Sequence, residues 1–241
     1  MMRSLLISSF LIVVLCSSSL ATADDKYYVK GGFGNIIGSE NERTNEVESG
    51  GDNLAFEMQA EGGVAFSLGF GVKTTSYLST EFTLQQNIGN DLKGDLLING
   101  KTIAESTGQD AESYILTEAD TLSVMVTAQF DINALTKKKL PIDPYVGLGL
   151  GWAKINLGEI AGKTFFQGTL ISESQIVSGG NSDGAAWRVS VGFTRPINKR
   201  YAIGVHYQYS NYGSVAIYDN EDGREIDLVA NEIFIGLKYS F

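Results

Sequence analysis

His206 is the only histidine in this chain of 241 residues, and a neutral imidazole is the usual general base beside a nucleophile. Ser210 follows four residues later, and catalysis requires the serine hydroxyl to lie within hydrogen-bond reach of the histidine. In an extended strand this spacing separates the two side chains by roughly 13 Å, which is too far for a direct hydrogen bond. The sequence therefore favours a protein that is not an enzyme.

The acidic segment 219–227, DNEDGREID, is a second candidate for chemistry, because carboxylates around a glycine occur in calcium-binding loops. This segment lacks the ligand spacing of such a loop, and the chain has one histidine and one cysteine with which to hold other metals. We therefore expect a solvated acidic loop, with no metal and no cofactor. The formal charge of −10 argues against nucleic acid as a partner.

These residues lie among segments in which apolar and polar side chains alternate strictly. In EGGVAFSLGFGV (61–72), valine, phenylalanine and leucine share one face, and glycine, alanine and serine share the other. A period of two residues marks a strand with two different faces. Eight segments show this pattern: 27–37, 61–72, 77–86, 121–132, 144–154, 186–195, 201–210 and 229–241.

The size of the side chains indicates which face of each strand points outward. Each segment is close to the roughly 9–11 residues with which a tilted strand crosses a bilayer. The large residues lie on the apolar face, and a barrel of eight strands has room for them outside but not inside. Aromatic residues gather near the strand ends, as in the girdles of membrane barrels: Trp152, Trp187, Tyr201, Tyr209, Tyr239 and Phe241. The sequence thus predicts an all-β protein, an eight-stranded antiparallel up-and-down transmembrane β-barrel.

Single charges recur on the face that this fold turns toward the lumen. Charges inside a barrel must pair or stay hydrated. A salt-bridge network that plugs the lumen is the structural interpretation, and a narrow ion path is the functional one. The inward charged residues are Lys30, Glu61, Glu81, Asp131, Arg188, Glu232 and Lys238.

The connections between the expected strands alternate in length and in charge. Those around 73–76, 133–143 and 196–200 are short and rich in lysine and arginine, whereas those around 38–56, 87–120, 156–184 and 211–228 are long and hold most of the acidic residues. Short turns on one side and long loops on the other are typical of outer-membrane barrels, with the long loops outside the cell. The charges keep each end solvated, and the alternative is that the acidic loops bind cations or a basic partner.

The first 23 residues predict a secretory signal peptide. Arg3 precedes an apolar run from Leu5 to Leu15, small polar residues follow, and Ala21 and Ala23 form an A-x-A cleavage site. The apolar run is too short for a membrane-spanning helix. A lipoprotein signal ending at Cys16 is disfavoured by the bulky residue before it. We therefore expect an exported chain, 24–241, that forms the barrel domain and contains no cysteine.

Three stretches carry motifs beyond simple alternation. DPYVGLGLGWA (143–153) contains Pro-Tyr-Val-Gly-x-Gly-x-Gly, GVHYQYSNYG (204–213) contains Tyr-x-Tyr-x-Asn-x-Gly, and LKYSF (237–241) alternates Leu237, Tyr239 and Phe241. In these the chain resembles the eight-stranded outer membrane proteins of Gram-negative bacteria, and especially the porin-like surface antigens grouped with the opacity proteins and the barrel domain of outer membrane protein A. The resemblance implies an outer-membrane location, and a C-terminal strand that pairs with the first. It also implies a signal at residues 237, 239 and 241 for the barrel assembly machinery.

These observations lead us to expect a bacterial surface protein surrounded by outer-membrane lipid. Adhesion to a host or extracellular ligand, antigenic display and mechanical support of the membrane are the roles that four long loops suggest. Three alternatives stay open: a channel of small conductance, an outer-membrane lipid-modifying enzyme and a secreted soluble barrel with an apolar ligand inside. A lipid A deacylase with a similar barrel uses a His-x-Ser pair, from which the spacing of His206 and Ser210 departs.

Overall fold

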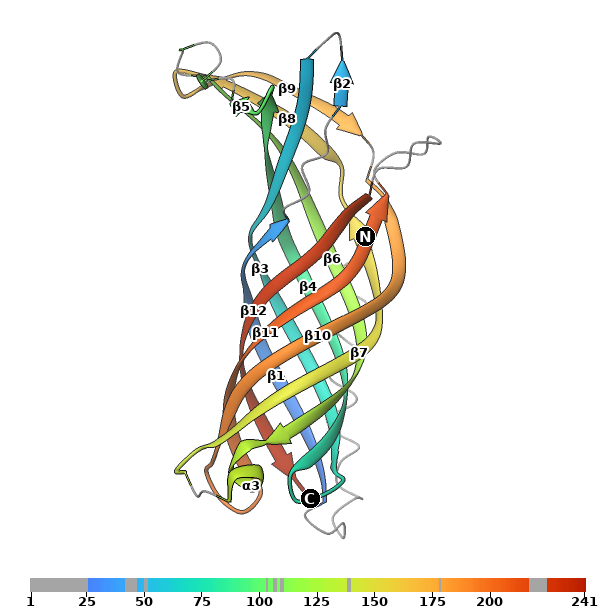
Figure 1. Ribbon diagram of the computed structural model, residues 1–241, viewed down its shortest axis with the longest axis vertical. Coiled ribbons are helices and arrows are strands. Elements are labelled where there is room, and N and C mark those ends of the chain that lie inside the picture. The colour runs from blue at the N-terminus through green and yellow to red at the C-terminus, as the bar shows by residue number, and fades with distance from the viewer. Residues whose placement is uncertain are drawn as a thin grey trace, which may run out of the picture.

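The computed structural model describes residues 26–41, 47–49, 52–102, 104–105, 108, 111–137, 140–177, 179–216 and 225–241. Eight long strands wind around a common axis (Figure 1). Each pairs antiparallel with the next along the chain, and the last pairs with the first, so the sheet closes on itself. The eight are β1 (Tyr27–Asn41), β3 (Asp52–Lys73), β4 (Leu78–Ile98), β6 (Ala111–Asp131), β7 (Asp143–Leu157), β10 (Asn181–Pro196), β11 (Tyr201–Ala216) and β12 (Glu225–Ser240).

The pairing of β1 with β12 closes the ring. Val29 lies opposite Tyr239 and Phe33 lies opposite Ile235, and ten residue pairs run along this junction. On its other side β1 pairs with β3 from Tyr27 to Asn35, so that neither edge of β1 is free there. A closed ring satisfies the backbone hydrogen bonds that lipid cannot. The predicted eight-stranded antiparallel up-and-down barrel is confirmed.

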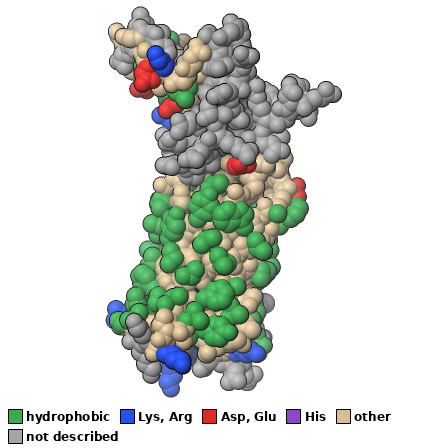
Figure 2. All heavy atoms as spheres, viewed as in Figure 1, with side chains coloured by type: hydrophobic (Ala, Val, Ile, Leu, Met, Phe, Trp, Pro, Cys, Tyr) green, Lys and Arg blue, Asp and Glu red, His purple; other side chains and the backbone are tan. Residues whose placement is uncertain are grey.

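The faces of the strands are also as predicted. Along β7 the burial alternates residue by residue, with Val146, Leu148, Leu150 and Trp152 exposed and the residues between them largely buried. Leu150 is 73% exposed, and such exposure of an apolar side chain is unfavourable in water but favourable in lipid. Figure 2 shows such apolar side chains covering the middle of the barrel, with lysine and arginine at its lower end.

Aromatic contacts mark the two borders of this apolar belt. Trp187 and Tyr209 lie with ring centroids 5.4 Å apart toward the end with the long connections. Tyr201 and Tyr239 lie 5.0 Å apart at the end with the short turns. Paired aromatic rings at both borders are the expected interfacial girdles.

The short turns lie where the sequence placed them. Residues 74–77 join β3 to β4, and residues 197–200 join β10 to β11. Between β6 and β7 a one-turn helix, α3 (Ile132–Thr136), begins directly after Asp131, whose carboxylate accepts a hydrogen bond from the backbone N of Ala134 (2.9 Å). This is a standard N-cap contact.

The strands at the opposite end are longer than predicted and extend into the four long connections. β3, β4 and β6 have 22, 21 and 21 residues, about twice the length that spans a bilayer. β8 (Ile160–Phe166) pairs with the outer part of β6, and β9 (Thr169–Val177) pairs with β8. Together with the short β2 (Val47–Ser49) and β5 (Lys101–Thr102), they form a sheet above the barrel (Figure 1), which we call the extracellular sheet because the long connections are predicted to lie outside the cell.

Bulges mark the level at which the barrel becomes this sheet. The register shifts at Gly62 in β3, between Asn87 and Asn90 in β4, and between Asn211 and Ser214 in β11. At the last of these the φ of Gly213 is 95°, and its backbone N donates to Oδ1 of Asn211 (2.9 Å), so the Asn-x-Gly pattern forms the bulge. A one-residue shift exchanges the two faces of a strand, and it turns the apolar residues beyond it inward.

The outer mouth of the barrel is filled by apolar side chains, a second departure from the prediction. The inward face was expected to carry mostly small and polar residues. Instead Ile36, Leu92, Ile155 and Leu228, from four different strands, are at most 1% exposed and belong to one buried cluster. The interior therefore has a polar section at the level of the apolar belt and an apolar section at its outer mouth.

No helix among the described residues is long and apolar enough to cross a membrane.

Candidate functional site

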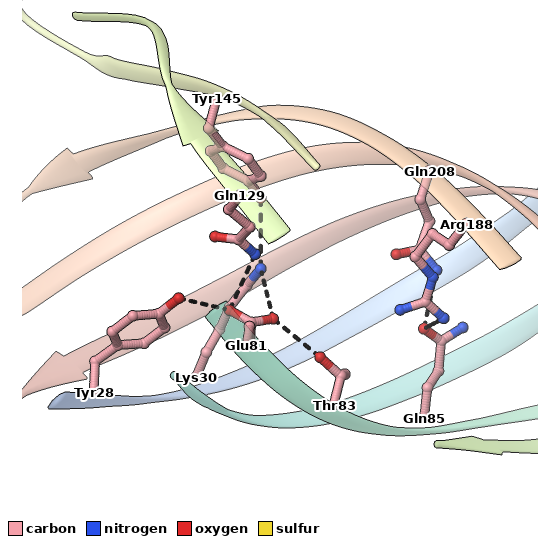
Figure 3. Close-up of polar contacts among 9 residues, drawn as sticks. All are labelled: Tyr28, Lys30, Glu81, Thr83, Gln85, Gln129, Tyr145, Arg188 and Gln208. Atoms are coloured by element: carbon pink, nitrogen blue, oxygen red, sulfur yellow. Dashed lines mark hydrogen bonds and ion pairs between the residues drawn. The ribbon is translucent and has the colours of Figure 1, made fainter. Parts of the chain in front are cut away.

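The inward side chains near the short turns gather around Glu81, which we call the Glu81 cluster. Tyr28 of β1 donates its hydroxyl to Glu81 (3.2 Å), and Gln129 of β6 donates to the same carboxylate oxygen (3.1 Å). Thr83 donates to the second oxygen (3.1 Å), and the Lys30 ammonium lies 3.9 Å from it. Side chains of three strands thus supply the hydrogen bonds and the positive charge that a buried carboxylate requires (Figure 3).

The remaining predicted charges at this end are not part of an ion-pair network. The Lys238 ammonium lies 3.8 Å from the centroid of the Tyr28 ring, a cation–π contact rather than a salt bridge. Asp131 caps α3 instead of joining the cluster, because the chain turns there into the helix. The side chain of Glu61 lies outside the described residues.

Further along the lumen a second group surrounds Glu232, which we call the Glu232 network. Glu232 is fully buried, at 0% exposure. Among the described residues, the side chains that bind its carboxylate come from β4 and β11, and they satisfy both oxygens. The donors are Gln85 (2.8 Å), Asn87 (2.7 Å), Gln208 (2.6 Å), Ser210 (3.0 Å) and Tyr212 (3.0 Å).

Arg188 is attached to the Glu232 network through neutral groups. Its Nη2 donates to Oε1 of Gln85 (2.6 Å), and its Nε donates to the hydroxyl of Ser210 (3.2 Å). Both residues also donate to Glu232, so the two opposite charges share hydrogen-bond partners. Such charge-assisted bonds are stronger than neutral ones, and shared partners couple their energies.

Two of these contacts cross the full width of the lumen. In the ring of eight strands, β4 and β11 are four positions apart, as are β1 and β7. Gln208 of β11 nonetheless donates to Gln85 of β4 (2.9 Å), and Lys30 of β1 reaches the hydroxyl of Tyr145 on β7 (3.5 Å). Figure 3 shows both groups reaching across the interior. The lumen is therefore bridged at two levels.

The two cavities that described residues line inside the barrel are small. A cavity of about 20 Å³ lies between Lys30, Arg188 and His206, which is room for about one water molecule. A second cavity of about 60 Å³ lies toward the short turns, beside Tyr28, Asp143 and Lys238. Small residues make this packing possible: a Cβ on Gly71 would lie 2.1 Å from the Tyr28 ring.

His206, the only histidine of the sequence, does not form the catalytic pair with Ser210 that the sequence analysis considered. The His206 ring stacks on Phe234 with the planes 4° apart and the centroids 5.0 Å apart. The hydroxyl of Ser210 donates to Glu232, not to His206. Among the described residues, moreover, no group of three or more potential metal-ligating side chains comes together.

Several residues of these groups were not singled out from the sequence. Gln85 and Gln208 share the inward face of their strands but were given no role, Ser210 was considered only as a nucleophile, and Tyr28, Asn87 and Tyr212 were not assigned. The signal that could have found the first three was present, since Gln85 has the parity of Glu81 on β4, and Gln208 and Ser210 have the parity of His206 on β11. Asn87 and Tyr212 also share it but lie past the ends of the predicted strands.

The residues of the proposed assembly signal lie on the outer surface at the short-turn end. Leu237 is exposed and Tyr239 half-exposed in the lipid-facing row of β12, and Tyr239 and Phe241 contact each other edge to face at 5.2 Å. Ala21 and Ala23 of the proposed cleavage site lie outside the described residues.

Sequence comparison decides the family of this barrel. The profile of the outer membrane protein beta-barrel domain matches residues 8–241. The chain belongs to this family. This outer membrane β-barrel protein is thus located in the bacterial outer membrane, with its apolar belt in contact with lipid. No curated protein shows significant sequence similarity to it.

Solved structures of similar fold are distant in sequence. Neisserial surface protein A superimposes with a TM-score of 0.51 at 14% identity, covering 89% of this chain and 97% of its own. OprG of Pseudomonas aeruginosa gives 0.49 at 13% identity, covering 90% and 95%, respectively. Ail, the attachment invasion locus protein of Yersinia pestis, gives 0.42 at 12% identity, covering 91% and 100%. The likeness to Neisserial surface protein A supports the fold.

Proposed function

We propose that this outer membrane β-barrel protein is a non-conducting, non-enzymatic surface protein that binds extracellular ligands through its extracellular sheet. The observation that carries the proposal is the filled lumen. Gln85–Gln208 and Lys30–Tyr145 bridge it, and the apolar cluster closes its outer mouth. An apolar constriction excludes water and hence ions. Function is then left to the surface outside the membrane.

The extracellular sheet has the properties of a binding surface. Tyr114 of β6 and Phe165 of β8 stack with centroids 5.4 Å apart, and the Lys93 ammonium lies 4.5 Å from the Tyr114 ring centroid. A surface cavity of about 260 Å³ lies beside these rings, and Ile171 of β9 is 62% exposed. Aromatic residues on an ordered, exposed scaffold are common centres of binding energy.

A catalytic role is disfavoured by the same structure. Ser210 is engaged by Glu232 and Arg188, and His206 is stacked inside the barrel. A lipid-modifying site would have to face the lipid, where most of the outward residues of the described strands are apolar or aromatic. A second part of the proposal concerns assembly. The barrel assembly machinery binds the outward C-terminal row of Leu237, Tyr239 and Phe241.

Adherence of intact cells tests this function. Cells that express the full chain are compared with cells that carry an empty vector on wells coated with collagen, fibronectin or laminin and on epithelial monolayers. We expect adherence above the vector control, and loss of the excess in a Tyr114→Ala/Phe165→Ala variant. A Leu150→Ala variant, altered only in the apolar belt, is the matched control, and heat-shifted migration on SDS gels verifies folding.

Adherence equal to the vector control on every surface would reject the binding role. Adherence that survives in the Tyr114→Ala/Phe165→Ala variant would reject the assignment to this face of the extracellular sheet. Exposure of the sheet is checked separately in intact cells with a membrane-impermeant maleimide. Ile171→Cys should react, and Lys199→Cys should react only after the outer membrane is permeabilised.

A further inference from the structure

One charged residue interrupts the lipid-facing row of β10. Val191, Phe193 and Arg195 occupy successive outward positions, and all three are exposed. The next outward side chain, Ile197 in the turn, is 61% exposed. Arg195 thus lies within an apolar surface, with an aliphatic residue between it and the end of the barrel.

The strand beside Arg195 is apolar at this level too. Arg195 lies opposite Ile203 of β11, which is 45% exposed on the same outer face. Neither Arg195 nor Arg200 forms an ion pair with an acidic residue in the described part of the chain. A cation on a lipid-facing surface is unfavourable unless it meets an anion or reaches the head groups.

A second arginine is fixed nearby by the turn. The side chain of Asn198 accepts hydrogen bonds from the backbone N of Arg200 and of Tyr201 (both 2.9 Å), which holds the turn in one form. Nη1 of Arg200 donates to the hydroxyl oxygen of Tyr239 (3.5 Å). The Tyr239 hydroxyl keeps its own hydrogen and can donate it to an anion.

Tyr201 stands between the two arginines. It lies on β11, whereas Arg195 lies on β10 and Tyr239, which holds Arg200, lies on β12. Arg195 pairs with Ile203, two residues along β11 from Tyr201, so the offset is about 10 Å across the strands and about 7 Å along them, a gap that two long arginine side chains can close around one anion. The patch of Arg195, Arg200, Tyr201 and Tyr239 lies at the short-turn border of the apolar belt, where basic side chains are seen in Figure 2.

We propose that this patch binds the phosphate of an anionic phospholipid in the periplasmic leaflet of the outer membrane. The planar guanidinium groups match the phosphate oxygens, and tyrosine hydroxyls are suited to the head-group level. The acyl chains of the lipid would lie along Phe193 and Ile203, which continue the row into the belt. An anionic lipid is preferred to a zwitterionic one because the patch holds two uncompensated positive charges.

Native mass spectrometry of the folded full-length barrel in detergent tests the proposal. Phosphatidylglycerol, phosphatidylcholine with the same acyl chains and inorganic phosphate are titrated in turn. We expect one tightly held phosphatidylglycerol, weakened about five-fold by Arg195→Gln or by Arg200→Gln and about 25-fold by both together. Lys137→Gln, which removes an exposed charge from the C-cap of α3 at the same end, is the matched control and should bind as the wild type does.

Three results would overturn the proposal. The double variant binds phosphatidylglycerol as tightly as the wild type, or Lys137→Gln weakens it as much as Arg195→Gln, which would indicate general surface charge. Alternatively, inorganic phosphate displaces the lipid, which would make the patch a site for the free anion. Because both arginines are exposed, the variants should fold, and heat-shifted migration on SDS gels verifies that they do.

Discussion

Replacing Glu232 by alanine should destabilise the barrel more than any other single loss of a lumen carboxylate. Glu232 is fully buried and accepts hydrogen bonds from five side chains of β4 and β11. Each buried donor that loses its partner costs about 1–3 kcal/mol. Water entering the vacated space and regrouping of the amides recover part of this, so the expected loss in the free energy of unfolding is about 3–5 kcal/mol, typical of a buried charge network missing one partner.

The assay is urea unfolding of the barrel folded in lipid vesicles. Trp152 and Trp187 are half-exposed on the lipid-facing surface, so their fluorescence reports the transfer from lipid to water. Glu232→Gln keeps one acceptor oxygen and should fall between alanine and the wild type. Glu112→Ala, an exposed acid of β6, should stay within about 0.5 kcal/mol of the wild type. If Glu232→Ala unfolds at the same urea concentration as Glu112→Ala, the Glu232 network does not stabilise the barrel.

Two further substitutions test the outer and inner faces of the wall. Val191→Arg, at a site 53% exposed within the apolar belt, should lower the free energy of unfolding in vesicles by about 2–4 kcal/mol, and unchanged stability would mean that this face does not meet lipid. Gly71→Val should cost about 1–3 kcal/mol in the same titration, because its Cβ would collide with the Tyr28 ring. Gly31→Val, where no atom lies within 4 Å of the added Cβ, should be tolerated, and equal losses at both glycines would contradict the packing described for the Glu81 cluster.

Most of the membrane-embedded part could be predicted from the sequence because lipid-facing and lumen-facing residues alternate along each strand. A strand with lipid on one side and a packed lumen on the other must alternate, and the alternation of β7 or β12 is visible directly in the residues. The same parity placed Lys30, Glu81, Arg188 and Glu232 inside. Parity does not predict which residues hydrogen-bond to each other, because contacts such as Gln85–Gln208 join two strands that are opposite in the ring.

The outer third of the molecule could not be predicted in the same way. The bulges at Gly62 in β3 and between Asn87 and Asn90 in β4 change the parity without a clear signal in hydrophobicity. Beyond them Leu92 points inward, although simple alternation from Glu81 would place it outside. Asp131 keeps its inward position opposite Tyr145, but the pattern could not predict that its carboxylate would cap α3.

Conductance across a planar lipid bilayer tests the central claim, a closed lumen, most directly. The wild-type barrel, inserted from detergent and shown by heat-shifted migration to be folded, is held at voltages of both signs. The bridged polar section and the apolar outer mouth predict a current indistinguishable from that of the protein-free bilayer. Reproducible unitary current steps that appear only with folded protein would contradict the account and make the protein a channel.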